Sequence, residues 1–116
     1  MELAVVVDCS NLDRSAAFWC AVLGYREEPN TGDRYRSLIP IGQNGVEILL
    51  QRVPEGKIGK NRLHLDLRVR DLSAEVARAE ELGARRITTA PIEEDGWRWH
   101  VLADPDGNEF CVLQGP

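Results

Sequence analysis

The chain has 116 residues, of which 43% are apolar and 28% are charged, and its formal net charge is −5 at pH 7. These values fit one globular domain, residues 1–116, and argue against a nucleic-acid partner. No apolar run approaches the roughly 18 residues of a membrane span, and the first residues lack the basic start of a signal peptide. Three cysteines do not suit a disulfide framework. We therefore expect a cytoplasmic protein with no membrane partner.

The first half of the chain reads as a strand, a helix and three further strands. Residues 3–9 are rich in β-branched side chains and predict a buried strand. Asn11 is a predicted N-cap, and apolar residues then recur at helical spacing as far as Gly24, a predicted left-handed stop. Short strands are expected at 25–28, 34–40 and 45–52, with turns at 30–32 and 42–45. This first module spans residues 1–52.

The second half repeats the pattern after a linker at 53–61. Residues 62–70 alternate apolar and polar side chains, as in a half-buried strand. Asp71 is expected to cap a helix that ends at Gly83, and strands are predicted at 85–88, 97–103 and 109–113. A turn at 104–107 joins the last two strands. The sequence therefore predicts an α+β fold made of two tandem βαβββ modules, the second spanning residues 62–116.

Strand alternation indicates which side chains share a face. If His64 faces a site, Asp66 and Arg68 face it too, while Leu63, Leu65 and Leu67 face the helix. The same parity selects Ala4, Val6 and Asp8, then Glu47, Leu49 and Gln51, and finally Glu109, Cys111 and Leu113. Trp97 and Trp99 share one face of their strand and His100 takes the other. So many polar groups on one face are costly to bury unless they are paired or hydrated, which favours a wet, functional cavity.

Several of these segments carry a family resemblance. The stretches 11–24, 64–72 and 103–110, above all Asp104-Pro-Asp-Gly-Asn108, resemble the vicinal-oxygen-chelate superfamily of glyoxalase I, extradiol dioxygenases, fosfomycin-resistance enzymes and bleomycin-binding proteins. Residues 51–66 resemble its small glyoxalase-like domain subgroup. The resemblance implies that the two modules form a cupped, partly closed mixed β-sheet with helices outside. It also implies a small-molecule ligand and a homodimer.

The family's enzymes hold a divalent metal with one residue from the first and last strand of each module. The matching positions here are Ala4, Glu47, His64 and Cys111. Ala4 has no donor atom, so the resemblance implies either an incomplete site for Zn, Ni, Co or Fe or no metal at all. Each candidate also has a structural explanation. His64 can hydrogen-bond Asp66 or Glu109, Glu47 can pair with Arg68, and Cys111 can be a small packed residue.

Three functions remain open. The favoured one is binding, sequestration or resistance without a metal, with a ligand contacted by Asp8, Gln51, Asp66, Arg68, Trp97 and Trp99. The two tryptophans are suited to stack on a flat or cationic ligand, although either can instead fill the core or a dimer interface. The second is a metal-dependent lyase, isomerase or dioxygenase using Glu47 and His64, with Glu47 or Glu109 as the base. The third is a metal-free enzyme in which His64 and Asp66 form an acid–base pair.

Overall fold

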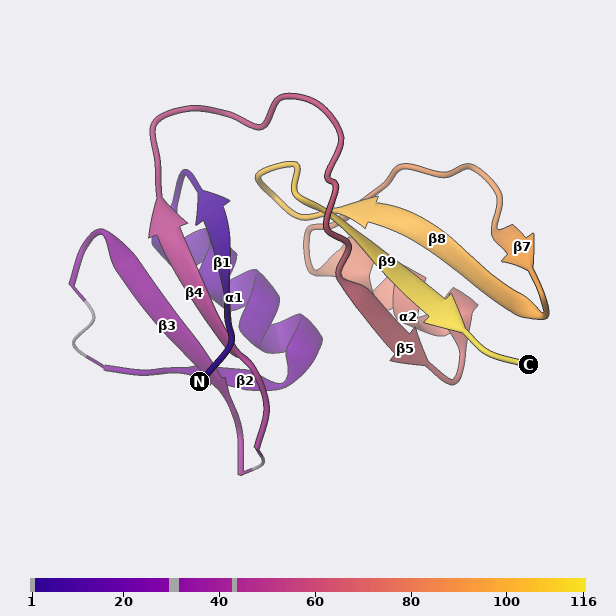
Figure 1. Ribbon diagram of the computed structural model, residues 1–116, viewed down its shortest axis with the longest axis horizontal. Coiled ribbons are helices and arrows are strands. Elements are labelled where there is room, and N and C mark those ends of the chain that lie inside the picture. The colour runs from indigo at the N-terminus through magenta and orange to yellow at the C-terminus, as the bar shows by residue number, and fades with distance from the viewer. Residues whose placement is uncertain (1, 30–31, 43) are drawn as a thin grey trace. The chain divides into compact units, whose positions relative to one another are not determined.

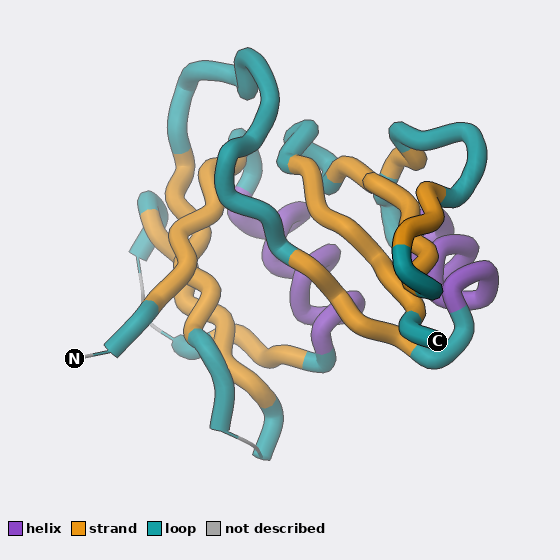
Figure 2. The backbone as a smooth tube through the Cα atoms, turned by 45° about the vertical axis from the view of Figure 1, so that its right-hand side comes forward, coloured by secondary structure: helices purple, strands orange, loops and turns teal. Residues whose placement is uncertain are grey.

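The computed structural model describes residues 2–29, 32–42 and 44–116. The chain divides into two compact units, Met1–Lys57 and Ile58–Pro116, and their boundary falls inside the predicted linker (Figure 1). In each unit a helix packs against a sheet of that unit (Figure 2). No helix in the described residues is long and apolar enough to cross a membrane.

The N-terminal unit contains one helix and a four-stranded sheet. Its elements are β1 (Ala4–Cys9), α1 (Leu12–Leu23), β2 (Tyr25–Glu27), β3 (Tyr35–Pro40) and β4 (Glu47–Arg52). The sheet order is β1-β4-β3-β2, with β1 and β4 parallel and the other pairs antiparallel. Both predicted helix ends are confirmed, because Asn11 Oδ1 accepts from the Arg14 N–H at 3.0 Å and Gly24 has a φ of 70°.

The C-terminal unit repeats this topology. Its elements are β5 (Asp66–Val69), α2 (Leu72–Glu81), β6 (Arg85–Arg86), β7 (Ile92–Glu94), β8 (Trp97–Ala103) and β9 (Glu109–Gln114). The sheet order is β5-β9-β8-β6, with β7 also paired to β8. Again the first and last strands of the unit are parallel neighbours. The shared strand order confirms an α+β fold of two tandem modules.

The structure differs from the sequence prediction around two strands. β5 begins at Asp66 rather than at residue 62, and Leu63 is 89% exposed instead of facing the helix. The backbone ladder to β9 ends where the Cys111 N–H donates to the Leu65 carbonyl. β7 was not predicted, because Ile92–Glu94 is short and exposed and forms a strand only through its pairing with β8. The predicted turns at 30–32 and 42–45 include residues 30, 31 and 43, which lie outside the described residues.

The core of each unit lies between its helix and one face of its sheet. In the N-terminal unit Trp19 packs edge-on against Phe18, with ring centroids 5.2 Å apart, and both side chains are buried. In the C-terminal unit Phe110 and Val112 of β9 are buried with Val76 of α2. Alternation then turns Cys111 and Leu113 to the opposite face of β9, as predicted. That opposite face is available for a binding site.

The Asp-Pro-Asp-Gly-Asn stretch is a structural turn between β8 and β9. Asp104 is 3% exposed, and its Oδ1 accepts the backbone N–H groups of Asp106 and Asn108 at 2.9 and 2.8 Å. Its Oδ2 accepts from the Asn108 side-chain amide at 3.0 Å. Gly107 has a φ of 86°, which suits glycine. This turn fixes where β9 begins and therefore places Glu109 and Cys111.

Candidate functional site

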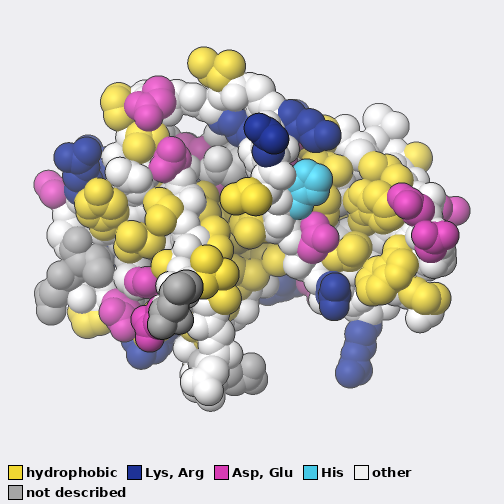
Figure 3. All heavy atoms as spheres, in the orientation of Figure 1, with side chains coloured by type: hydrophobic (Ala, Val, Ile, Leu, Met, Phe, Trp, Pro, Cys, Tyr) yellow, Lys and Arg dark blue, Asp and Glu magenta, His cyan; other side chains and the backbone are white. Residues whose placement is uncertain are grey.

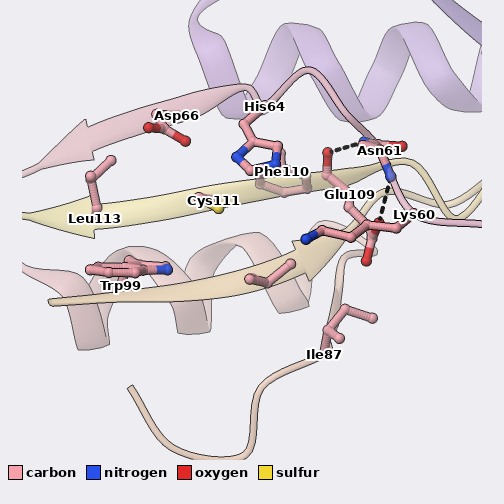
Figure 4. Close-up of a pocket in the computed structure, with 11 residues that line it drawn as sticks. Lys60, Asn61, His64, Asp66, Ile87, Trp99, Glu109, Phe110, Cys111 and Leu113 are labelled. Atoms are coloured by element: carbon pink, nitrogen blue, oxygen red, sulfur yellow. Dashed lines mark hydrogen bonds between the residues drawn. The ribbon is translucent and has the colours of Figure 1, made fainter. Parts of the chain in front are cut away.

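A cavity of about 410 Å³ lies on the helix-free face of the C-terminal sheet (Figure 4). Strands β5, β8 and β9 contribute to it, together with the segment that precedes β5. The lining residues are Lys60, Asn61, His64, Asp66, Ile87, Trp99, Val101, Glu109, Phe110, Cys111 and Leu113. The structure thus brings together five of the residues predicted for the site: His64, Asp66, Trp99, Glu109 and Cys111.

One part of the cavity is an apolar wall. Trp99 on β8 is directly opposite Leu113 on β9, and Val101 is opposite Cys111. These side chains share a face because His100 and Leu102, which alternate with them, are buried on the other side. Trp97 lies outside this cavity, where the Arg68 guanidinium sits 5.6 Å from the centroid of its ring. The two tryptophans therefore share a face but have different surroundings.

Another part of the cavity is polar and is fixed by Asn61. The Asn61 side-chain amide donates to the Glu109 carbonyl at 3.0 Å, and its backbone N–H donates to Glu109 Oε1 at 3.4 Å. The Asn61 side chain thus takes the place of the backbone hydrogen bonds that were predicted for this segment. Lys60, the residue before Asn61, lies beside the cavity (Figure 4). Sequence reasoning assigned residues 53–61 to a linker and did not place Asn61 at the site. Alternation from Trp99 would have identified Val101, but no local signal identified Asn61.

Cys111 and Asp66 are register partners on β9 and β5. Burial first, and then the neighbouring Asp66 carboxylate, which accepts a hydrogen bond from the thiol, raise the pKa of Cys111 to about 11. The thiol is therefore neutral near pH 7 and donates to the Asp66 carboxylate.

His64 is exposed and points into the cavity (Figure 4). Asp66 and Glu109 line the same cavity, but within the described residues His64 forms no hydrogen bond or ion pair with either. The imidazole is thus open to a ligand. The alternative explanation, in which His64 is a structural residue hydrogen-bonded to Asp66 or Glu109, is therefore not supported by a contact in the described residues.

The predicted site residues of the N-terminal unit lie on one face of its sheet. Ala4 is paired with Glu47, and Asp8 with Gln51, in the β1–β4 register. Glu47 accepts a hydrogen bond from Ser37, and Gln51 Nε2 lies 3.4 Å from the Tyr35 hydroxyl. The pairing of Glu47 with Arg68 would join the two units and stays a prediction.

The strand register corrects the proposed equivalence of Glu47 and Cys111. Val6 and Asp66 each lie five residues before their helix cap, and they pair with Leu49 and Cys111 respectively. The counterpart of Cys111 is therefore Leu49, and the counterpart of Glu47 is Glu109. Ala4 and His64 are therefore related by the internal repeat, whereas Glu47 and Cys111 are not.

The donor set does not fit a metal centre. Among residues 2–29, 32–42 and 44–116, no three His, Cys, Asp or Glu side chains form a group able to hold a metal ion. Ala4 contributes no donor atom. Zinc and related metals usually take three or more protein ligands. We therefore derive no chemistry through a metal at this site.

Comparisons with known proteins agree with the fold. The glyoxalase-like domain family matches residues 4–113. A glyoxalase/bleomycin resistance protein/dioxygenase family enzyme from Burkholderia phytofirmans PsJN superposes with a TM-score of 0.77 at 20% identity, covering 97% of each chain. The fosfomycin resistance protein FosX from Mesorhizobium loti has a TM-score of 0.74 at 17% identity, covering 100% of this chain and 92% of that one.

A third similar structure contains ligands. It is the E126Q mutant of FosX from Listeria monocytogenes, complexed with Mn(II) and 1S,2S-dihydroxypropylphosphonic acid. Its TM-score is 0.77 at 15% identity, covering 97% of this chain and 88% of that one. No curated protein matches the chain in sequence. On the match over residues 4–113, the chain belongs to the glyoxalase-like domain family.

Proposed function

We propose that this protein binds a small organic molecule in the cavity of its C-terminal unit, without a metal ion, in a sequestration or resistance role. The observation that carries the proposal is the cavity itself, which combines an apolar wall at Trp99 and Leu113 with polar groups at its edge. Its volume of about 410 Å³ falls in the range of roughly 300–1,000 Å³ that small-molecule sites occupy. Family membership supports a small-molecule ligand but does not identify it.

Two observations favour binding without a metal over the metal-dependent lyase. The first is the missing donor at Ala4. The second is that Glu47 already accepts a hydrogen bond from Ser37 in the N-terminal unit. The alternative in which His64 and Asp66 act as an acid–base pair uses the same cavity, and a reaction assay distinguishes it from binding.

A fragment screen read by NMR tests the proposal. The three indole N–H signals of ¹⁵N-labelled protein are assigned with single Trp→Phe variants. Mixed neutral, cationic and anionic fragments are then added in the presence of EDTA. We expect bound fragments to shift the Trp99 signal and to leave the signal of Trp19, which is buried in the N-terminal core, unchanged. Trp99→Ala should weaken binding by about tenfold or more, because the contact area between the fragment and the indole ring is lost.

The outcomes of the screen separate the three functions. Binding that appears only after Zn, Ni, Co or Fe(II) is added, and that is lost in Glu47→Ala and His64→Ala, would replace the proposal with the metal-dependent one. Chemical conversion of a fragment that stops in His64→Ala would favour the acid–base enzyme. If no fragment shifts the Trp99 signal under any condition, the cavity is not a binding site.

We also propose that the protein is a cytoplasmic homodimer, which is supported by the family resemblance and by three cysteines that are all free. Light scattering after size-exclusion chromatography tests the oligomeric state, and a monomeric mass at micromolar concentration would contradict it.

A further inference from the structure

The segment 58–70, which precedes and includes β5, is positively charged in an otherwise acidic chain, and of its charged side chains Lys60 and Asp66 line the cavity. Residues 58–70 contain four Lys and Arg residues and one Asp, whereas the whole chain has a net charge of −5. Figure 3 shows Lys and Arg side chains gathered beside a histidine on the visible face, with hydrophobic side chains next to them. A local positive potential next to an apolar surface attracts anions.

The charged groups inside the cavity differ in whether the protein already pairs them. Asp66 accepts a hydrogen bond from the Cys111 thiol, and Glu109 accepts one from the Asn61 backbone. Lys60 and His64 form no hydrogen bond or ion pair within the described residues. Figure 4 shows the Lys60 side chain extending into the cavity. The two carboxylates therefore have donors, while an ammonium and an imidazole lack partners.

An ammonium beside an apolar wall gains more from an anionic partner than from a neutral one, because charge-assisted hydrogen bonds are stronger and water competes less there. The same ammonium repels a cation that approaches Asp66 or Glu109. The apolar remainder of the ligand is then placed against Trp99, Leu113 and Ile87. An indole ring offers a flat face on which a second ring can pack.

We propose that the ligand is a planar apolar molecule that carries one oxyanion, with the oxyanion held by Lys60 and His64 and the ring packed against Trp99. This inference rests on the proposed function, since it concerns the same cavity. It specifies the chemical class of the ligand, for which an aromatic carboxylate is the simplest representative.

Three probes of matched shape test the charge requirement. They are 2-naphthoate, 2-naphthamide and 2-naphthylmethylamine, titrated separately while the Trp99 indole N–H signal is followed. We expect 2-naphthoate to bind about tenfold more tightly than the amide, since only the anion can form a charge-assisted hydrogen bond with Lys60. The amine should bind most weakly. Raising the salt concentration should weaken the binding of naphthoate and leave the binding of the amide unchanged.

Two variants locate the effect at Lys60. Lys60→Met keeps an unbranched apolar side chain and removes the ammonium, so naphthoate should bind only as tightly as the amide does. Arg62→Met is the matched control, because it removes the same charge from the same segment but lies outside the cavity. It should change naphthoate affinity by less than about twofold.

Equal affinity for naphthoate and naphthamide would overturn the inference, as would preference for the amine or an equal loss in the two variants. If the amide or the amine still shifts the Trp99 signal, the cavity remains a binding site and only the ligand class is wrong. If naphthoate does not bind at all, the inference fails, and the wider fragment screen decides separately whether the proposed function also fails.

Discussion

The Thr88 hydroxyl oxygen lies 2.7 Å from Nδ1 of His100 and also accepts the Val101 backbone N–H at 3.1 Å. His100 is 5% exposed and lies on the face of β8 that Leu102 shares, opposite the cavity. Burial first, and then the positive charge of Arg86, lower the pKa of His100. This histidine is therefore a neutral structural group. It is buried, whereas His64 is exposed.

The buried His100 makes stability depend on pH. Because its folded pKa lies below the ordinary value of about 6.5, the unfolded chain takes up the proton first as the pH falls. The free energy of unfolding should be constant above that value and decrease below it, before carboxylates titrate. Urea denaturation at pH 7.5, 6.5 and 5.5 measures this. The slope should flatten in His100→Gln and persist in His64→Gln, and equal slopes in all three proteins would contradict the assignment.

Asp104 should be important for stability because of its turn. Asp104→Ala leaves two backbone N–H groups and the Asn108 amide without their carboxylate acceptor. We expect a loss of about 2–4 kcal/mol in the free energy of unfolding. Asp104→Asn keeps an acceptor for the backbone groups and should lose less. A loss in Asp104→Ala below that of Asp104→Asn, measured by urea denaturation, would show that the carboxylate does not hold the turn.

The thiol of Cys111 should react slowly. With a pKa of about 11, roughly one thiol in a thousand is ionised at pH 8. The rate of alkylation by iodoacetamide, followed at this residue by mass spectrometry, should therefore increase steadily with pH up to about that pKa. Asp66→Asn removes the nearby charge, lowers the pKa of Cys111 and should speed the reaction at pH 8, while Asp95→Asn should not. An unchanged rate in Asp66→Asn would mean that burial alone sets the reactivity.

Asn61 should control how firmly the segment before β5 is held. Asn61→Ala removes the side-chain hydrogen bond to the Glu109 carbonyl, which typically contributes about 1 kcal/mol. Amide hydrogen exchange in residues 58–65 should accelerate, and fragment affinity should fall because Lys60 is no longer held at the cavity. Asn44→Ala, in the N-terminal unit, is the control. Unchanged exchange in residues 58–65 would show that other contacts hold this segment.

The sequence predicted the parts of the fold that are determined by local chemistry. Asn11 and Gly24 mark a helix because capping and a positive φ act over a few residues, and the Asp104 turn is similarly local. Alternation also placed Trp99, Cys111 and Leu113 on one face. Asn61 escaped prediction because its position depends on Glu109, far along the chain. The equivalence of Glu47 and Cys111 was wrong because strand register is a property of pairing that the spacing from a turn does not determine.

In both units the last strand lies inside the sheet, with β4 between β1 and β3 and β9 between β5 and β8. Neither sheet can therefore be assembled progressively as the chain leaves the ribosome. Until residues 109–114 are available, β5 and β8 each expose an unpaired edge, which is the surface through which strands of different molecules associate. Conditions that slow synthesis near residue 108 should accordingly favour aggregation of the unfinished chain.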